Sequence, residues 1–274
     1  MRELQRTIIA EMQVRPKIDS EQEVDRRVQF LCDYLAATGA RGMVLGISGG
    51  LDSTLAGRLA QLAAERRRAA GEAAEFVAVR LPYRHQHDED DALAAMTFIN
   101  PDVAVTYDVA PAVDGFVENW SQTGWAPLSD FTKGNIKARA RMIAQYAMAG
   151  ERGYLVLGTD HGAESVTGFF TKFGDGAADI LPLWGLNKGQ NRQLLRHLGG
   201  AERLWAKAPT ADLLDERPGQ TDEAELGISY DHIDAYLEAR EVPVEVAERI
   251  EAAWRRTRHK RTGPVTPADI WWRG

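Results

Sequence analysis

Residues 46–54 read Gly-Ile-Ser-Gly-Gly-Leu-Asp-Ser-Thr, and they constrain the fold of this chain more than any other segment. They follow the apolar run 43–45 and precede apolar residues at helical spacing from Leu55 onward, which predicts a strand, a turn and a helix in succession. Gly49 and Gly50 let the backbone come close to a ligand. Free N–H groups and the dipole at a helix N-terminus favour an anion. The segment therefore predicts a phosphate cradle.

The side chains of this segment add to the prediction. Hydroxyl groups of Ser48, Ser53 and Thr54 can donate hydrogen bonds. The carboxylate of Asp52 is misplaced beside phosphates unless a divalent cation lies between them. No lysine follows the glycines, so the segment is not a Walker A loop. The alternative reading is a glycine-rich turn from strand to helix that binds no ligand.

Composition narrows the class of protein. The 274 residues suit one large α/β domain, with 44% hydrophobic and 27% charged residues. A net charge of −7 does not indicate nucleic-acid binding. No apolar run is long enough to span a bilayer, and the polar N-terminus lacks a signal-peptide core. Cys32, the only cysteine, lies in a helical apolar pattern and is read as a packing residue. These features predict a cytoplasmic protein.

Strands and helices are expected to alternate along the first two thirds of the chain. Strands are predicted near 43–47, 76–79, 103–107 and 155–158, and helices near 4–13, 21–37, 88–99, 131–149, 188–198, 230–239 and 243–258. Such alternation predicts a Rossmann-like parallel sheet flanked by helices, with a more helical C-terminal part, in a single domain spanning 1–274. Ligands of such sheets bind beyond the carboxyl ends of the strands. Ser48, Arg80 and the run 159–161 each follow a predicted strand.

The loop 46–54 and four further segments of the chain resemble those of known enzymes. The loop resembles the Ser-Gly-Gly-x-Asp-Ser loop of enzymes that split ATP into AMP and pyrophosphate. Residues 134–142, 158–183, 209–214 and 259–261 are similar, in the same order, to bacterial ammonia-dependent NAD synthetases. The resemblance implies a fold like that of the adenine nucleotide alpha hydrolases and a homodimer. It also implies that Mg-ATP adenylates the nicotinate carboxylate of deamido-NAD, after which ammonia displaces AMP and gives NAD.

The resemblance assigns roles to individual residues. ATP contacts are expected from Gly46, Ile47, Ser48, Gly49, Gly50, Leu51, Asp52, Ser53, Arg80, Gln86, Thr159, Lys188 and Thr210. Mg²⁺ ligands are expected at Asp52 and Glu164. Deamido-NAD contacts are expected from Arg139, Lys172, Asp179, His259 and Lys260, with Phe131 and Phe169 as ring-stacking candidates. Asp175 is expected to be catalytic, holding ammonium and taking its proton.

The residues themselves leave plainer readings open. Glu164, expected in a turn past a buried strand, can cap a helix instead. Lys188 can be a solvated cation in a first helical turn, although the dipole disfavours it there. Asp175 lies between two glycines that also suit a plain turn.

The second set of cations is equally open. Arg139 is expected on the border of an apolar stripe formed by Ile136, Ala140 and Ile143, with Arg141 pointing away from it. An exposed helix arginine is the alternative for Arg139, and a C-terminal charge run is the alternative for 259–261. Phe131 and Phe169 can be core residues, as can Phe170. The stretch 83–87 matches the family only loosely around Gln86.

The nitrogen donor is predicted from domain content. Glutamine-dependent relatives carry an amidase domain with a cysteine nucleophile, whereas fewer than fifty residues precede this loop, so free ammonia is expected. Met142 and Tyr146 lie outside the predicted stripe of helix 131–149, which favours a dimer interface there. The rival functions are a GMP synthetase-like ligase, a tRNA-modifying enzyme and a non-catalytic nucleotide-binding protein.

Overall fold

The computed structural model describes residues 1–84, 88–210, 213–216 and 219–273. Its centre is a four-stranded parallel sheet in the order β3-β2-β1-β4. The strands are β1 (Gly42–Gly46), β2 (Glu75–Arg80), β3 (Val103–Thr106) and β4 (Leu155–Val156). The predicted α/β class with a parallel sheet is therefore confirmed. None of the described helices is long and apolar enough to cross a membrane.

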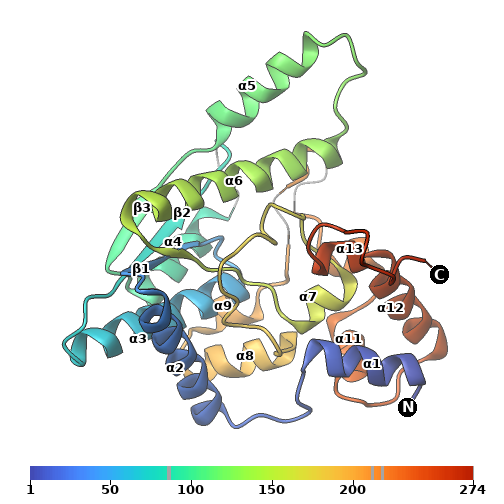
Figure 1. Ribbon diagram of the computed structural model, residues 1–274, viewed down its shortest axis with the longest axis horizontal. Helices are drawn as coiled ribbons and strands as arrows, with labels where there is room; N and C mark the ends of the chain where they lie inside the picture. The colour runs from blue at the N-terminus through green and yellow to red at the C-terminus, as the bar shows by residue number, and fades with distance from the viewer. Residues whose placement is uncertain (85–87, 211–212, 217–218, 274) are drawn as a thin grey trace.

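Helices cover both faces of the sheet (Figure 1). Successive side chains of a strand point to opposite faces, so Met43 and Leu45 join one core while Val44 joins the other. The first core contains residues of α2 (Ser20–Thr38), α3 (Leu51–Ala69), α4 (Glu89–Ile99) and α8 (Lys188–His197). The second core contains residues of α5 (Ala110–Ser121) and α6 (Asp130–Arg152). The sheet is thus buried on both sides, as parallel sheets are.

A third core lies away from the sheet. It joins α1 (Glu3–Met12), α7 (Gly162–Thr167), α11 (Tyr230–Leu237) and α12 (Val244–Arg256). The first helix of the chain therefore packs among the last ones, and Figure 1 shows α1 beside α11 and α12. The short helices α9 (Glu202–Ala206), α10 (Asp222–Leu226) and α13 (Arg258–Arg261) complete the described elements. This helical C-terminal part was also predicted.

The structure corrects part of the buried face predicted for α6. Ala144 is buried, and Ile136 and Ala140 pack against the second core as expected, but two other residues of the predicted stripe do not. Ile143 is 63% exposed and Ala147 is exposed, whereas Lys137 and Ala138 are buried. Lys137 tolerates burial because its ammonium donates to Leu213 O at 2.9 Å and pairs with an acid nearby. Arg141, expected to point away, is half-buried, and its Nε donates to Leu81 O at 2.9 Å. Polar residues of α6 are thus buried or half-buried through hydrogen bonds to other segments. The spacing of apolar residues alone therefore does not identify the buried face of this helix.

Three further expectations need correction. The fourth strand has two residues rather than four, because Leu157 forms only an isolated bridge with Ile180. Glu164 lies in the first turn of α7 and not in a turn without helix. The helices α5, α7, α9, α10 and α13 were not predicted; the last four have six residues or fewer, which is too short for a periodic apolar pattern.

Candidate active site

The loop between β1 and α3 is braced by its own hydroxyl groups. Ser48 Oγ lies 3.0 Å from Ser53 Oγ, and Thr54 Oγ1 donates to Gly50 O at 2.7 Å. Gly49 has φ = 87°, and a Cβ there would lie 2.6 Å from the backbone nitrogen of Ala92 in α4. Only glycine suits both conditions. The hydroxyls expected to face a phosphate thus also fix the shape of the loop.

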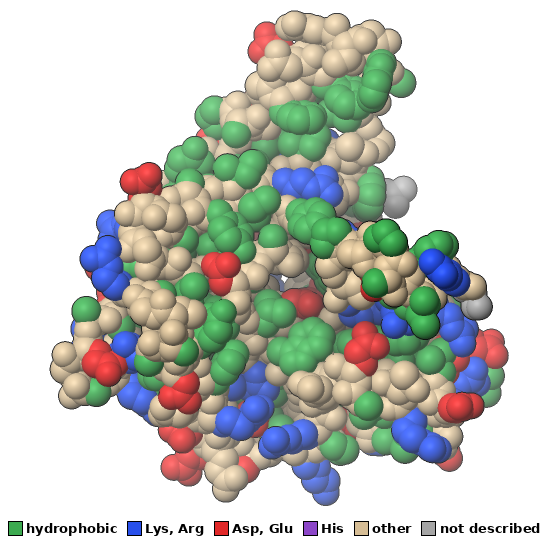
Figure 2. Space-filling view, viewed as in Figure 1, with side chains coloured by type: hydrophobic (Ala, Val, Ile, Leu, Met, Phe, Trp, Pro, Cys, Tyr) green, Lys and Arg blue, Asp and Glu red, His purple; other side chains and the backbone are tan. Residues whose placement is uncertain are grey.

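A cavity of about 290 Å³ lies beyond the carboxyl ends of β1 and β4. Figure 2 shows this face hollowed between α6, α7 and α13. Many residues expected to bind ATP or to act in the reaction line it: Gly46, Ile47, Ser48, Gly50, Leu51, Asp52, Ser53, Thr159, Glu164, Phe169, Asp175, Lys188 and Thr210. The loop 46–54, α7 and α8, which are far apart in the sequence, therefore meet at one cavity. This cavity lies where ligands of parallel sheets bind, beyond the carboxyl ends of the strands.

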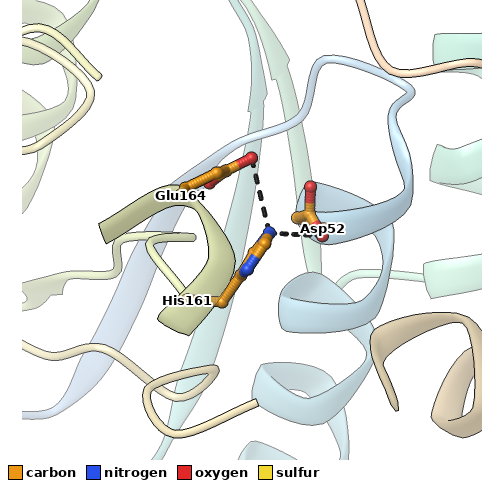
Figure 3. Close-up of side chains that lie close together, drawn as sticks. All are labelled: Asp52, His161 and Glu164. Atoms are coloured by element: carbon orange, nitrogen blue, oxygen red, sulfur yellow. Dashed lines mark ion pairs between the residues drawn. The ribbon is translucent and has the colours of Figure 1, made fainter. Parts of the chain in front are cut away.

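Four charged side chains meet at the wall of this cavity. Lys188 Nζ lies 2.7 Å from Asp52 Oδ2 and 3.1 Å from Glu164 Oε1. His161 Nε2 lies 3.4 Å from Asp52 Oδ1 and 3.4 Å from Glu164 Oε1. In Figure 3 the His161 ring points between the two carboxylates, one from α3 and one from α7. The cluster contains two acids and two bases in direct contact.

The cluster keeps all four groups charged. Burial opposes the charge of His161, but the two carboxylates raise its pKa to about 10. Burial also opposes the charge of Lys188, yet Asp52 and Glu164 raise its pKa above the usual value. Burial favours neutral carboxyls, but Lys188 and His161 hold the pKa values of Asp52 and Glu164 below the usual range. Lys188 is 1% exposed, so the solvated-cation reading is wrong.

The carboxylates of Asp52 and Glu164 suit a divalent cation. Ligand atoms of Asp52, His161 and Glu164 lie within 4.8 Å of one another. Mg²⁺ prefers carboxylate oxygens and phosphate oxygens from a substrate. The two carboxylates therefore provide oxygen donors of the kind that Mg²⁺ prefers.

Helix α11 contacts both the backbone and the ammonium group of Lys188. The Lys188 N–H donates to Asp234 Oδ1 at 3.1 Å, and the Gly189 N–H donates to Asp234 Oδ2 at 2.7 Å. Lys188 Nζ lies 4.6 Å from the centre of the Tyr230 ring. Both Tyr230 and Asp234 belong to α11, one turn apart. Helix α11 therefore positions a lysine that lies on α8.

Asp175 lies at the edge of the cavity. Its Oδ1 accepts a hydrogen bond from the Thr171 N–H at 3.0 Å, and surrounding protein atoms raise its pKa. A Cβ on Gly176 would lie 2.4 Å from the Phe170 ring, so the neighbouring glycine is needed for this turn. The carboxylate thus belongs to a tight turn and also faces the cavity.

The second set of expected cations lies at the rim. Arg139 is exposed, and its guanidinium donates to Lys172 O at 3.2 Å. Lys172 Nζ donates to His259 O at 2.6 Å, which joins α13 to this rim. Lys260 Nζ donates to the carbonyls of Gly168 and Phe170 at 2.8 and 2.7 Å. The structure therefore brings Arg139, Lys172, His259 and Lys260 together.

Other expected residues lie apart from the cavity wall. Arg80 pairs with Glu89 at 2.6 Å, and Asp179 Oδ2 accepts from the Val156 N–H at 2.7 Å. Phe131 is 65% exposed, so its core-packing alternative is wrong. Gln86 lies outside the described residues.

Comparisons with known proteins show the family of this chain. A model of the NAD synthase family matches residues 23–264. The chain belongs to the NAD synthase family. It is 58% identical over 270 residues to the NH(3)-dependent NAD(+) synthetase of Bacillus velezensis, a match that covers 98% of this chain and 99% of that protein.

Two solved structures are similar to this member of the NAD synthase family. The crystal structure of NAD+ synthetase from Burkholderia pseudomallei matches with a TM-score of 0.82 and 52% identity, covering 94% of this chain and 96% of that one. The structure of NMN synthetase from Francisella tularensis matches with a TM-score of 0.80 and 35% identity, covering 92% and 100%. The product of a relative with this fold is therefore not always NAD.

Several residues at the site of this NAD synthase family chain escaped the sequence reasoning. Asn191 Nδ2 donates to Asp52 Oδ1 at 2.8 Å, and its spacing from Lys188 on one helix was a usable signal. His161 was noted only as a polar residue after a strand. Asp234 and Tyr230 gave no signal, because their contact with Lys188 depends on how α11 packs against α8.

Proposed function

We propose that this protein is an ammonia-dependent NAD synthetase. It adenylates the nicotinate carboxylate of deamido-NAD with Mg-ATP, and ammonia then displaces AMP to give NAD. The observation that carries the proposal is the cluster of Asp52, Glu164 and Lys188 beside the loop 46–54, in a chain of the NAD synthase family. The relative with 58% identity is named for ammonia as its donor.

The first step suits the loop and the charged cluster. Asp52 and Glu164 would hold Mg²⁺, which stabilises the negative charge of the departing pyrophosphate. Backbone N–H groups at the start of α3 bind phosphate oxygens. The ammonium of Lys188 donates hydrogen bonds to the same phosphates. The substrate carboxylate attacks the α-phosphorus, the bond to the β-phosphate oxygen breaks, and an acyl-adenylate forms.

The second step suits Asp175. Its carboxylate faces the cavity and can hold ammonium by charge and hydrogen bonding. A raised pKa makes it a stronger base than an ordinary aspartate. Asp175 takes one proton from ammonium, which leaves NH₃ with a free lone pair. NH₃ attacks the carbonyl carbon, AMP leaves with the bonding electrons, and nitrogen loses a second proton to solvent. The rim cations Arg139, Lys172 and Lys260 suit the phosphates of the dinucleotide.

We also propose a cytoplasmic homodimer with one domain per chain. Large apolar side chains are exposed on α5, α6 and the segment between them: Phe116, Trp125, Phe131 and Ile143 are 48–70% exposed. Phe116 stacks on Trp120, which meets Trp125 edge-on. Water-exposed aromatic clusters of this kind mark interfaces.

Product analysis tests the bond that is broken. With ATP, ammonium and deamido-NAD, the protein should release AMP and pyrophosphate in equal amounts, and release should depend on deamido-NAD. Nicotinate mononucleotide serves as the competing acceptor, because one structural neighbour is named an NMN synthetase. ADP as the nucleotide product would refute the proposal. Preference for the mononucleotide would reassign the acceptor.

A further inference from the structure

One ammonium group bridges the two carboxylates that we assign to the divalent cation, and the inference below rests on that proposed function. Lys188 Nζ lies 2.7 Å from Asp52 Oδ2 and 3.1 Å from Glu164 Oε1. The lysine is 1% exposed, so water does not weaken these contacts. The ammonium thus neutralises the charge that would attract a metal.

The second oxygen of Asp52 is also engaged. Asp52 Oδ1 accepts from Asn191 Nδ2 at 2.8 Å and lies 3.4 Å from His161 Nε2. Each oxygen of Asp52 therefore already has a protein donor. Two cations bound to the same oxygens in a buried site repel each other strongly. A divalent cation held by Asp52 and Glu164 must therefore displace the Lys188 ammonium from them.

The structure gives the ammonium room to leave while its backbone stays. Asp234 fixes the backbone of Lys188 through the N–H bond at 3.1 Å. The side chain has four rotatable bonds, and it lines the same cavity as Ser48 and Ser53 of the loop. Rotation can carry the ammonium from the carboxylates toward phosphates bound at that loop.

We propose that Lys188 is an internal counter-cation that a divalent metal must displace, with the phosphates of the nucleotide accepting the displaced ammonium. A metal alone then binds weakly, because it competes with Lys188. Nucleotide that draws Lys188 away frees the carboxylates, so metal and nucleotide bind with positive coupling beyond chelation by the phosphates. Linkage makes this coupling equal in both directions.

The test measures Mn²⁺ binding without nucleotide, by electron paramagnetic resonance and calorimetry. Mn²⁺ is the probe because it accepts the same oxygen ligands as Mg²⁺. Lys188→Met should bind Mn²⁺ on the order of tenfold more tightly than the wild type, the usual scale of coupling between sites. Lys260→Met is the matched control, because Lys260 donates to the carbonyls of Gly168 and Phe170 and its loss frees no carboxylate.

A second variant and a second readout protect the test against a folding defect. Lys188→Gln keeps a donor group near the carboxylates and removes the charge. Mn²⁺ should raise the melting temperature of a Lys188 variant more than that of the wild type, because a ligand of the folded state stabilises it. Unchanged or weaker Mn²⁺ binding by the folded Lys188 variants would overturn the proposal. An equal gain in Mn²⁺ affinity in Lys260→Met would overturn it as well, because the loss of any positive charge near the cavity would then explain the result.

NAD synthesis by the wild type, measured with Mg-ATP, separates this proposal from the proposed function. If the wild type makes NAD but the Lys188 variants do not bind Mn²⁺ more tightly, only the proposed displacement of Lys188 is refuted. Absence of synthesis by the wild type refutes the reaction, whatever the metal titration shows.

Discussion

At the scale of single residues, we expect the acids of the cavity to act in different steps of the reaction. Asp52 and Glu164 contact Lys188 and His161, which keeps them ionised. Asp175 forms no ion pair among the described residues, and burial raises its pKa despite the nearby charge of Lys260. Asp52→Ala or Glu164→Ala should abolish both pyrophosphate exchange into ATP and NAD formation. Asp175→Asn should retain exchange in the presence of deamido-NAD and lose amide formation by about 10²-fold, the usual scale for a general base. Loss of exchange in Asp175→Asn would place that carboxylate in the first step.

At the scale of elements, α11 holds the N-terminus of α8 through Asp234. Burial raises the pKa of Asp234 to about 6, against the lowering effect of the Gly189 and Lys188 N–H bonds. Between the unfolded value near 3.8 and about 6 the folded protein binds more protons than the unfolded chain. Its stability from this group therefore falls as the pH rises through that window. Asp234→Asn cannot ionise, so its free energy of unfolding relative to the wild type should improve from pH 4 to pH 6, by about 2–3 kcal/mol. Urea unfolding across this range measures it, and a constant difference would contradict the assignment.

The same elements show what the sequence could and could not predict. The loop 46–54 and the alternation of strands and helices follow from local pattern, because each depends only on neighbours in the chain. The assignment of Asp52 and Glu164 to the metal came from the resemblance to the family. The buried face of α6 was predicted only in part, because Lys137 and Arg141 take up buried or half-buried positions through hydrogen bonds to Leu213 and Leu81, which are far along the sequence. The support of Lys188 by α11 was not predicted for the same reason: it depends on tertiary packing. The role of each site residue stays a prediction.

At the scale of the whole molecule, we expect a dimer that forms through α5 and α6. Ile143 on α6 is 63% exposed, and Val244 on α12 is 61% exposed. Ile143→Asp should shift sedimentation toward the monomer, because removing a charge from water in an apolar interface costs free energy. Val244→Asp, matched in exposure and chemistry, should leave the dimer intact. A wild-type protein that sediments as a monomer at micromolar concentration would contradict this part of the account.

The chain joins free ammonia to deamido-NAD, with no glutamine needed as the nitrogen donor. Mass spectrometry of the product formed from ¹⁵N-ammonium, ATP and deamido-NAD tests it most directly. We expect NAD with one ¹⁵N in its carboxamide, formed at a rate that rises with pH as NH₃ replaces NH₄⁺. Amide-¹⁵N glutamine should give little label. Unlabelled or absent NAD with ammonium, or efficient labelling from glutamine by the purified chain alone, would contradict it.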